Sequence, residues 1–188
     1  NPMRLAEPRL APVAPADMTE EQQEILAPML RGEGVGASAA NVFATLVHYP
    51  KLMKRWTVFA NHCLFKSSLP AREREIVILR TAWQAQSGYE WGQHLVIGAD
   101  AGLSNEEMNA LKGAPGHYPW SDANRALIEA TDELDGDAFL TDPTWERVTA
   151  HFSQDQVFDL IFLVGQYRML AGALNSLGVQ LDDGLESF

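Results

Sequence analysis

One histidine and two glutamates near the middle of the chain have the types and spacing that proton transfer requires. Glu90 and His94 are four residues apart, which on a helix places a carboxylate and an imidazole one above the other on a single face. Glu75 lies beside the apolar stripe of the preceding predicted helix. A neighbouring carboxylate fixes the tautomer of an imidazole and raises its basicity, so the ring can move a proton near neutral pH. His94, Glu75 and Glu90 are therefore the candidate catalytic residues.

The same spacing also has a purely structural interpretation. A glutamate and a histidine four residues apart often form only a surface pair on a helix. Ile97 and Ala101 continue the face of His94, so the imidazole is expected to point towards apolar surroundings. A histidine on such a face is often a hydrogen-bonded core residue. Spacing alone leaves both interpretations open.

Two consecutive helices are predicted to position these residues. Pro70 suits the first position of a helix, because its missing N–H would have no partner there, and this helix is expected to run to about residue 86. Ser87 and Gly88 form the predicted break between the helices. The second helix is expected to end at Gly102 in a left-handed cap conformation.

The remaining segments also predict helices joined by short loops. Three capping boxes, in which a serine or threonine is followed three residues later by Glu or Gln, mark helix starts at Thr19, Ser104 and Ser153. Asn41 is expected to cap a further short helix. With about eight such helices and no convincing strand alternation, the sequence predicts an all-α fold. We expect one domain over residues 1–188, with an extended proline-rich arm at residues 1–16.

The last helix, over about residues 154–177, is apolar nearly all round. Such a helix is expected to be buried on most sides, in the core or between subunits. Gly165 and Gly172 in its interior suggest close approach of a neighbouring helix. The glycine-rich segment 32–40 is expected to be a flexible connection, with a lid over a pocket as the alternative.

The overall charge narrows the classes of partner. The chain of 188 residues has a net charge of −11 and a sequence pI of about 4.8, which opposes binding to nucleic acid or to an anionic membrane. No apolar run approaches the ~20 residues that span a bilayer, and no signal peptide is visible. Cys63 is the one cysteine, so no intrachain disulfide can form and a reducing compartment is the default. We therefore expect a cytoplasmic protein that acts on a small molecule.

Three motifs along the two central helices resemble one known superfamily. They are REREIVILRTA, SGYEWGQH and ADAGLSNEE, within residues 69–111. Their order and spacing resemble the carboxymuconolactone decarboxylase superfamily, which includes the alkyl hydroperoxidase D-like proteins. The resemblance implies the alkyl hydroperoxidase D-like helical bundle, assembly into homo-oligomers, and functional roles for Glu75 and His94.

The chain departs from the peroxidase branch of that superfamily at the residues that carry redox chemistry. That branch has a glutamate, a Cys-x-x-Cys pair, and a histidine four residues after the second cysteine. Ser87 and Glu90 stand at the two cysteine positions here. The resemblance therefore favours the decarboxylase branch, which works without a cysteine pair.

The first functional hypothesis is a cofactor-independent decarboxylase, a lyase that acts on a small carboxylated lactone or a related product of aromatic compound breakdown. His94 would deliver the proton that replaces CO2, and one or both glutamates would orient it. Tyr89, Trp91 and Ser87 are the expected substrate-binding residues, and no metal or cofactor is expected. The alternatives are a hydroperoxide-reducing enzyme and a non-catalytic oligomeric module of the same fold.

Basic residues that could hold a carboxylated substrate are few. Arg72, Arg74 and Arg80 lie on the first central helix, and Arg72 and Arg80 could equally pair with carboxylates of other helices. Cys63 is expected to be a small buried hydrophobic residue, and His62 to be exposed or at a subunit contact.

Overall fold

The computed structural model describes residues 3–31 and 38–188, with the side chains of residues 31 and 38 left out. In this part of the chain the α-helices are α1 (Glu20–Leu26), α2 (Asn41–Leu46), α3 (Pro50–Asn61), α4 (Ala71–Gln84), α5 (Gly88–Asp100), α6 (Asn105–Ala110), α7 (Asp122–Asp137), α8 (Asp142–His151) and α9 (Gln154–Leu177). Shorter elements are the 3-10 turns η1 (Pro15–Asp17), η2 (Ala27–Met29) and η5 (Pro115–His117), the π-helical turn η4 (His62–Lys66), and the antiparallel pair β1 (Leu30–Arg31) and β2 (Ser38–Ala39). The all-α prediction is confirmed, with one more α-helix than the eight expected.

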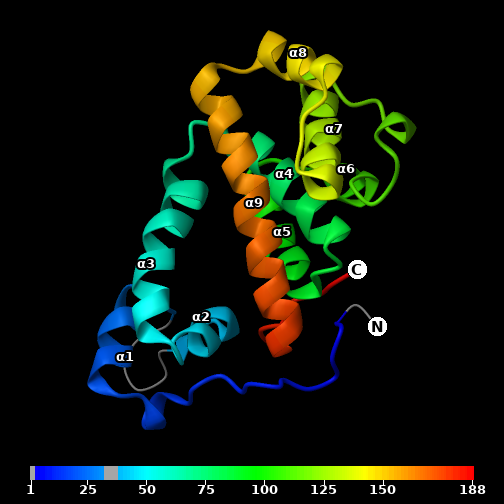
Figure 1. Cartoon of the computed structure of the whole chain (residues 1–188). Coiled ribbons are helices and arrows are strands. Elements are labelled where there is room, and N and C mark those ends of the chain that lie inside the picture. The colour runs from blue at the N-terminus through cyan, green and yellow to red at the C-terminus, as the bar shows by residue number, and fades with distance from the viewer. Residues whose placement is uncertain (1–2, 32–37) are drawn as a thin grey trace.

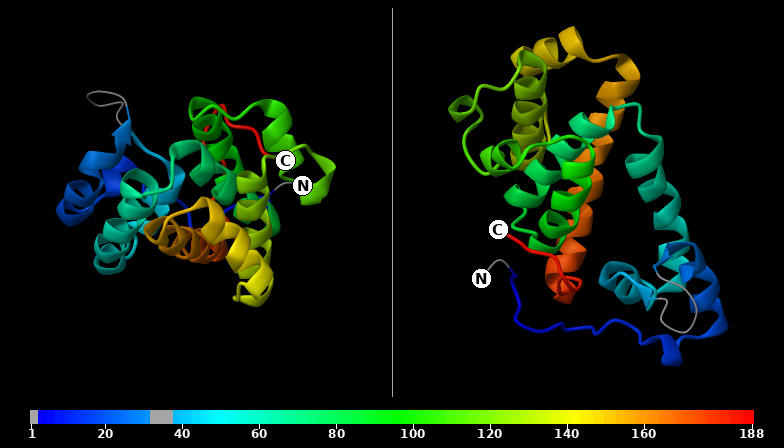
Figure 2. Two further views of the ribbon diagram at one scale, coloured as in Figure 1. Left: turned by 90° about the horizontal axis from the view of Figure 1, so that it is seen from above. Right: turned by 180° about the vertical axis from the view of Figure 1, so that it is seen from behind.

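Helix α9 is the central element of the bundle (Figure 1). Helices α4, α5 and α7 pack along one side of α9, and α3 stands on the other side, as the front and rear views agree (Figures 1 and 2). Its bounds match the predicted range, and a capping box at Ser153 and Gln156 starts it. Length and composition would also allow α9 to cross a membrane, with 44% of its most apolar window buried inside the bundle. The core helix of a bundle passes the same test of length and composition.

One face of α9 is uncovered in the single chain. Phe158, Phe162 and Met169 are more than half exposed on it. A Cβ atom added at Gly165 or Gly172 would meet nothing within 4 Å. The predicted close approach of another helix at these glycines is therefore wrong within the chain, because they lie on this open face.

The turn between α4 and α5 differs from the prediction in its details. Pro70 is the cap residue before α4 rather than its first residue, and Gly88 is the first residue of α5 rather than the break. The chain turns instead at Gln86, whose φ is +50°. The Ser87 N–H donates to the Ala82 carbonyl at 2.9 Å, which closes the end of α4. At the far end of α5 the left-handed cap at Gly102 is confirmed, with φ of +94°.

The described part of the N-terminal arm lies extended across the end of the bundle (Figure 1). The Arg9 N–H donates to the Leu177 carbonyl, and the Val13 N–H donates to the Ala44 carbonyl. Asn41 does not cap α2, because it is the first helical residue and its side chain donates to backbone carbonyls of the C-terminal segment. The predicted flexible segment 32–40 falls mostly outside the described residues.

Candidate active site

Glu75 links an arginine and a histidine through its two carboxylate oxygens. Its side chain is fully buried on α4. Oε1 accepts a hydrogen bond from Nε of Arg74 at 3.1 Å, and Oε2 lies 2.6 Å from Nδ1 of His94 on α5. A carboxylate can only accept, so Nδ1 of the imidazole carries the proton and Nε2 is left to interact with another group. The hydrogen bond fixes the orientation of the His94 ring.

An aromatic side chain of α9 also packs against the His94 ring. The rings of His94 and Tyr167 are 5.0 Å apart and nearly perpendicular. Tyr167 is itself buried, and burial together with the Glu75 carboxylate raises its pKa well above the ordinary range. Tyr167 is therefore a neutral phenol that packs on the imidazole and does not compete as a base.

His94 borders a cavity of about 530 Å³ between α2, α3, α5 and α9. The lining is predominantly apolar, as is usual for small-molecule sites. The charged and polar side chains that line it are Trp56, Thr57, Asn61, Arg74, Tyr89, Glu90, Gln93, His94, Gln166 and Tyr167. Arg74 is the one cation among the described lining residues, and its Nε alone is engaged by Glu75.

Glu90 is the second acidic group of this cavity. Its side chain is buried, and neither carboxyl oxygen has a hydrogen-bond partner among the described residues. Burial raises the pKa of Glu90 to about 8, and the nearby Ser87 hydroxyl opposes part of that rise. Glu90 is therefore mostly protonated at neutral pH, and it can donate a hydrogen bond or a proton to a bound molecule.

The two glutamates thus have different roles, although the helical spacing suggested Glu90 as the direct neighbour of His94. Glu75 makes the hydrogen bond to the imidazole and lies behind the ring, out of the cavity. Glu90 lines the cavity and makes no hydrogen bond to His94. Glu75 is hydrogen-bonded to a guanidinium and an imidazole, and Glu90 is an acid with a raised pKa and no hydrogen-bond partner among the described residues.

The three predicted substrate-binding residues occupy different places. Tyr89 lines the cavity, and its hydroxyl donates to Asp182 at 2.9 Å and accepts from the Val42 N–H at 3.2 Å. Ser87 is buried at the start of α5, outside the cavity lining. Trp91 faces away from the cavity and packs against Trp83 and Phe188 in a separate core cluster.

Several cavity residues were not identified from the sequence. Gln93 is one residue before His94 and gave no signal of its own. Gln166 and Tyr167 lie on α9, where apolar residues on all sides left the facing direction undetermined. Of the three arginines considered, Arg74 alone lines the cavity.

The other two arginines of α4 pair with carboxylates of other helices, as considered from the sequence. Arg72 pairs with Glu107, and Arg80 makes a two-pronged ion pair with Asp132 at 2.6 and 2.7 Å. Both guanidinium groups therefore form ion pairs that link α4 to neighbouring helices.

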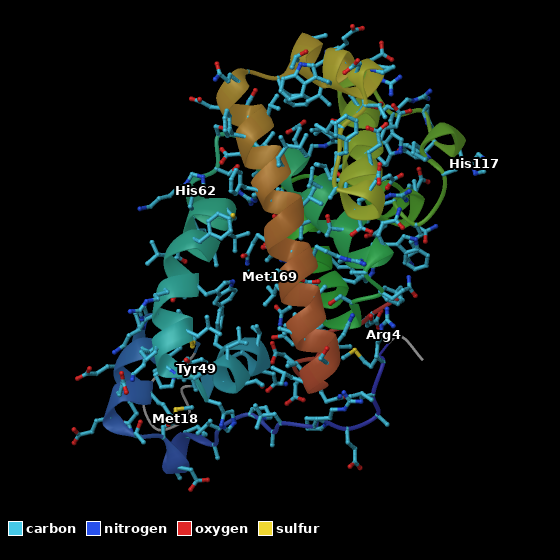
Figure 3. The ribbon with its side chains drawn as sticks, viewed as in Figure 1. Arg4, Met18, Tyr49, His62, His117 and Met169 are labelled. Carbon is cyan, nitrogen blue, oxygen red and sulfur yellow. The ribbon has the colours of Figure 1, made fainter. Side chains whose placement is uncertain are left out.

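Cys63 is buried and does not line the cavity. Burial, with the Asp159 carboxylate adding to it, raises the pKa of the Cys63 thiol to about 11. His62, exposed as expected, lies 2.7 Å from Asp159 on the outer edge of the bundle (Figure 3). Among the described residues no three His, Cys, Asp or Glu side chains form a group that could hold a metal ion.

Comparison with known proteins gives a family match over part of the chain and a shared fold. Residues 50–133 match the profile of the Carboxymuconolactone decarboxylase family. No curated protein matches the sequence of the chain.

Solved structures with the same fold share little sequence identity with this chain. An uncharacterized peroxidase-related protein from Ralstonia eutropha, with an alkylhydroperoxidase AhpD core, is 20% identical over 95% of both chains, with a TM-score of 0.77. A peroxidase-related protein from Silicibacter is 15% identical over 97% of this chain and 93% of its own, with a TM-score of 0.72. The debrominase Bmp8 in complex with 2,3,4-tribromopyrrole is 11% identical over 95% of this chain and 94% of its own, with a TM-score of 0.73. Residues 50–133 are thus similar to the carboxymuconolactone decarboxylase family, and the chain has the alkyl hydroperoxidase D-like fold.

Proposed function

We propose that the chain is a cofactor-independent lyase that removes CO2 from a small carboxylated lactone or a related product of aromatic compound breakdown. The observation that carries the proposal is a single apolar cavity containing both a histidine oriented by Glu75 and a neutral acid, Glu90. A pair of titratable groups whose environments differ in this way suits acid–base chemistry.

The proposed step is balanced without an added reductant or oxidant. When the bond to the carboxylate breaks, its electron pair moves onto the adjacent carbonyl and leaves an enolate together with CO2. The protonated imidazole of His94 then supplies the proton that the carbon requires, and solvent restores it. Arg74 and the neutral Glu90 offer N–H and O–H donors to the enolate oxygen, where negative charge develops.

The size and lining of the cavity support a small, largely apolar substrate. A volume of about 530 Å³ suits a molecule of one or two rings. A debrominase with the same fold binds 2,3,4-tribromopyrrole, a small planar ring. Apolar walls also favour decarboxylation, because a carboxylate loses stabilising hydration there while the departing CO2 is neutral.

A peroxidase function is the second candidate, because two relatives with this fold are peroxidase-related proteins. A thiolate is the nucleophile of such enzymes. Here Ser87 and Glu90 occupy the positions of the cysteine pair, and Cys63 is buried with a raised pKa outside the cavity. A non-catalytic module is the third candidate. The cavity beside His94 argues against it, because a non-catalytic protein does not require a cavity there.

A panel of substrates tests the proposal directly. Purified protein is incubated with carboxylated lactones, β-keto acids and alkyl hydroperoxides, and CO2 release and peroxide consumption are followed. We expect CO2 release from a carboxylated lactone with no cofactor added. Peroxide consumption with a dithiol, and no CO2 release, would instead support the peroxidase.

A further inference from the structure

A second cavity, of about 510 Å³, lies between the N-terminal arm, the end of α4 and the last turns of α9. It shares no lining residue with the cavity at His94. Three arginines line it, Arg4 and Arg9 from the arm and Arg168 from α9, and Figure 3 shows Arg4 where the arm passes beside the end of the bundle. The described lining residues include no Asp or Glu. This is a local concentration of positive charge on a chain whose net charge is −11.

Among the described residues, each arm arginine donates one N–H group to the protein, and the other N–H groups of its guanidinium have no partner there. Nη2 of Arg4 donates to the Ala85 carbonyl at 3.1 Å, and Nη1 of Arg9 donates to the Ser176 carbonyl at 3.2 Å. A guanidinium has five N–H donors. Among the described residues neither arginine forms an ion pair with a carboxylate.

These two contacts also have a structural role, because Ala85 and Ser176 lie at helix C-termini. A helix C-terminus carries about half of an elementary negative charge. The two positive charges of the guanidinium groups are larger than the combined negative charge of the two helix C-termini. The cavity therefore keeps a net positive charge after both helices are capped. Arg168 adds to this charge only in part, since it pairs with Asp135 at 3.2 Å.

Polar groups complete the lining. Asn175 donates to the Ala85 carbonyl at 3.1 Å, and Arg4 donates to the same carbonyl. Gln84 and Ser176 supply further polar groups. Planar guanidinium groups bind carboxylate and phosphate oxygens through paired N–H donors.

We propose that this cavity is a binding site for a small anion that carries two or more carboxylate or phosphate groups. Two separated guanidinium groups match two anionic groups of one ligand better than they match a single charge. The site is independent of the chemistry at His94.

Isothermal titration calorimetry at low ionic strength tests the site, with citrate and pyrophosphate as probes and benzoate as a monovalent control. Low salt is needed because exposed charges are screened. We expect citrate or pyrophosphate to bind, and benzoate to bind at least tenfold more weakly. Whichever of citrate and pyrophosphate binds more tightly shows whether the site prefers carboxylate or phosphate groups. Arg4→Gln and Arg9→Gln should each weaken binding about tenfold, the usual loss for one charge-assisted hydrogen bond.

Arg55→Gln is the matched control. Arg55 is likewise exposed and donates to one backbone carbonyl, that of Lys51 at 3.0 Å, but it does not line the cavity. Its substitution should leave binding unchanged. The proposal is overturned if neither polyanion binds, if benzoate binds as tightly, or if Arg55→Gln weakens binding as much as the arm variants. Melting curves without ligand separate a loss of fold from a loss of binding.

Discussion

His94 and Glu75 lie on consecutive helices, and a hydrogen bond of 2.6 Å joins Nδ1 of the imidazole to Oε2 of the carboxylate. The turn at Gln86 brings α5 back along α4, so residues nineteen positions apart meet inside the bundle. Because Glu75 also accepts from Arg74, one buried carboxylate sets the orientation of both groups. This shared partner leads to the first prediction.

Replacing Glu75 should destabilise the fold as well as misplace the imidazole. Glu75→Leu leaves the Arg74 guanidinium and the His94 N–H without their acceptor in a buried place, which typically costs about 3–5 kcal/mol. Urea denaturation measures the free energy of unfolding. The exposed Glu24 is the control, and Glu24→Leu should change stability by less than about 0.5 kcal/mol. Equal effects of the two substitutions would show that the buried hydrogen bonds contribute little.

The raised pKa of Glu90 makes stability depend on pH. Its pKa is about 8 in the folded protein against an ordinary value of 4.5, so between these values the folded state holds a proton that the unfolded state has lost. The free energy of unfolding should therefore fall as the pH rises from about 4.5 to about 8, by up to about 1.4 kcal/mol per pH unit.

Glu90→Gln keeps the shape of the side chain but does not titrate. Both proteins are denatured at a series of pH values. The free energy of unfolding of the wild type should fall relative to that of Glu90→Gln between about pH 4.5 and about pH 8, and the difference should stay constant above about pH 8. Parallel curves would mean that Glu90 titrates at an ordinary pKa.

Cys63 should be unreactive in the folded protein. Burial raises the pKa of its thiol to about 11, so little thiolate forms near neutral pH. A thiol-reactive dye should label Cys63 at least tenfold more slowly in the native protein than in urea, and peroxide should not be consumed through it. Rapid native labelling, together with peroxide turnover that stops in Cys63→Ser, would favour the peroxidase.

The open face of α9 leads us to propose that the chain forms a homo-oligomer. Phe158 and Met169 are 58% and 55% exposed there, and exposed apolar patches commonly mark interfaces. Light scattering at low micromolar concentration should give a multiple of 20.8 kDa, and Phe158→Glu should lower it. Phe139, also 58% exposed but between α7 and α8, is the control, and Phe139→Glu should leave the mass unchanged. A wild-type mass of one chain would refute the proposal.

Local signals predicted the helices well, because caps and apolar periodicity are properties of neighbouring residues. The capping box at Ser153 and the left-handed cap at Gly102 are both present. The turn at Gln86 was missed, since a non-glycine residue with positive φ leaves no clear mark in a sequence.

The site was predicted less completely than the fold. The sequence proposed His94, Glu75 and Glu90 as a group, but which glutamate contacts the imidazole depends on how α4 packs against α5. Helical spacing describes contacts within one helix and cannot rank them against contacts between helices. For the same reason Trp91 was expected in the cavity, although it packs on the opposite side of α5.

The proton-transfer role of His94 is the central claim, and one comparison tests it most directly. CO2 release from a carboxylated lactone is measured for the wild type, His94→Ala and Cys63→Ser, each checked for an intact fold by circular dichroism. General acid–base catalysis contributes roughly two to four orders of magnitude in rate, so His94→Ala should be slower by that factor. Cys63→Ser should retain the wild-type rate, because Cys63 lies outside the cavity. A folded His94→Ala protein that releases CO2 as fast as the wild type would contradict the account.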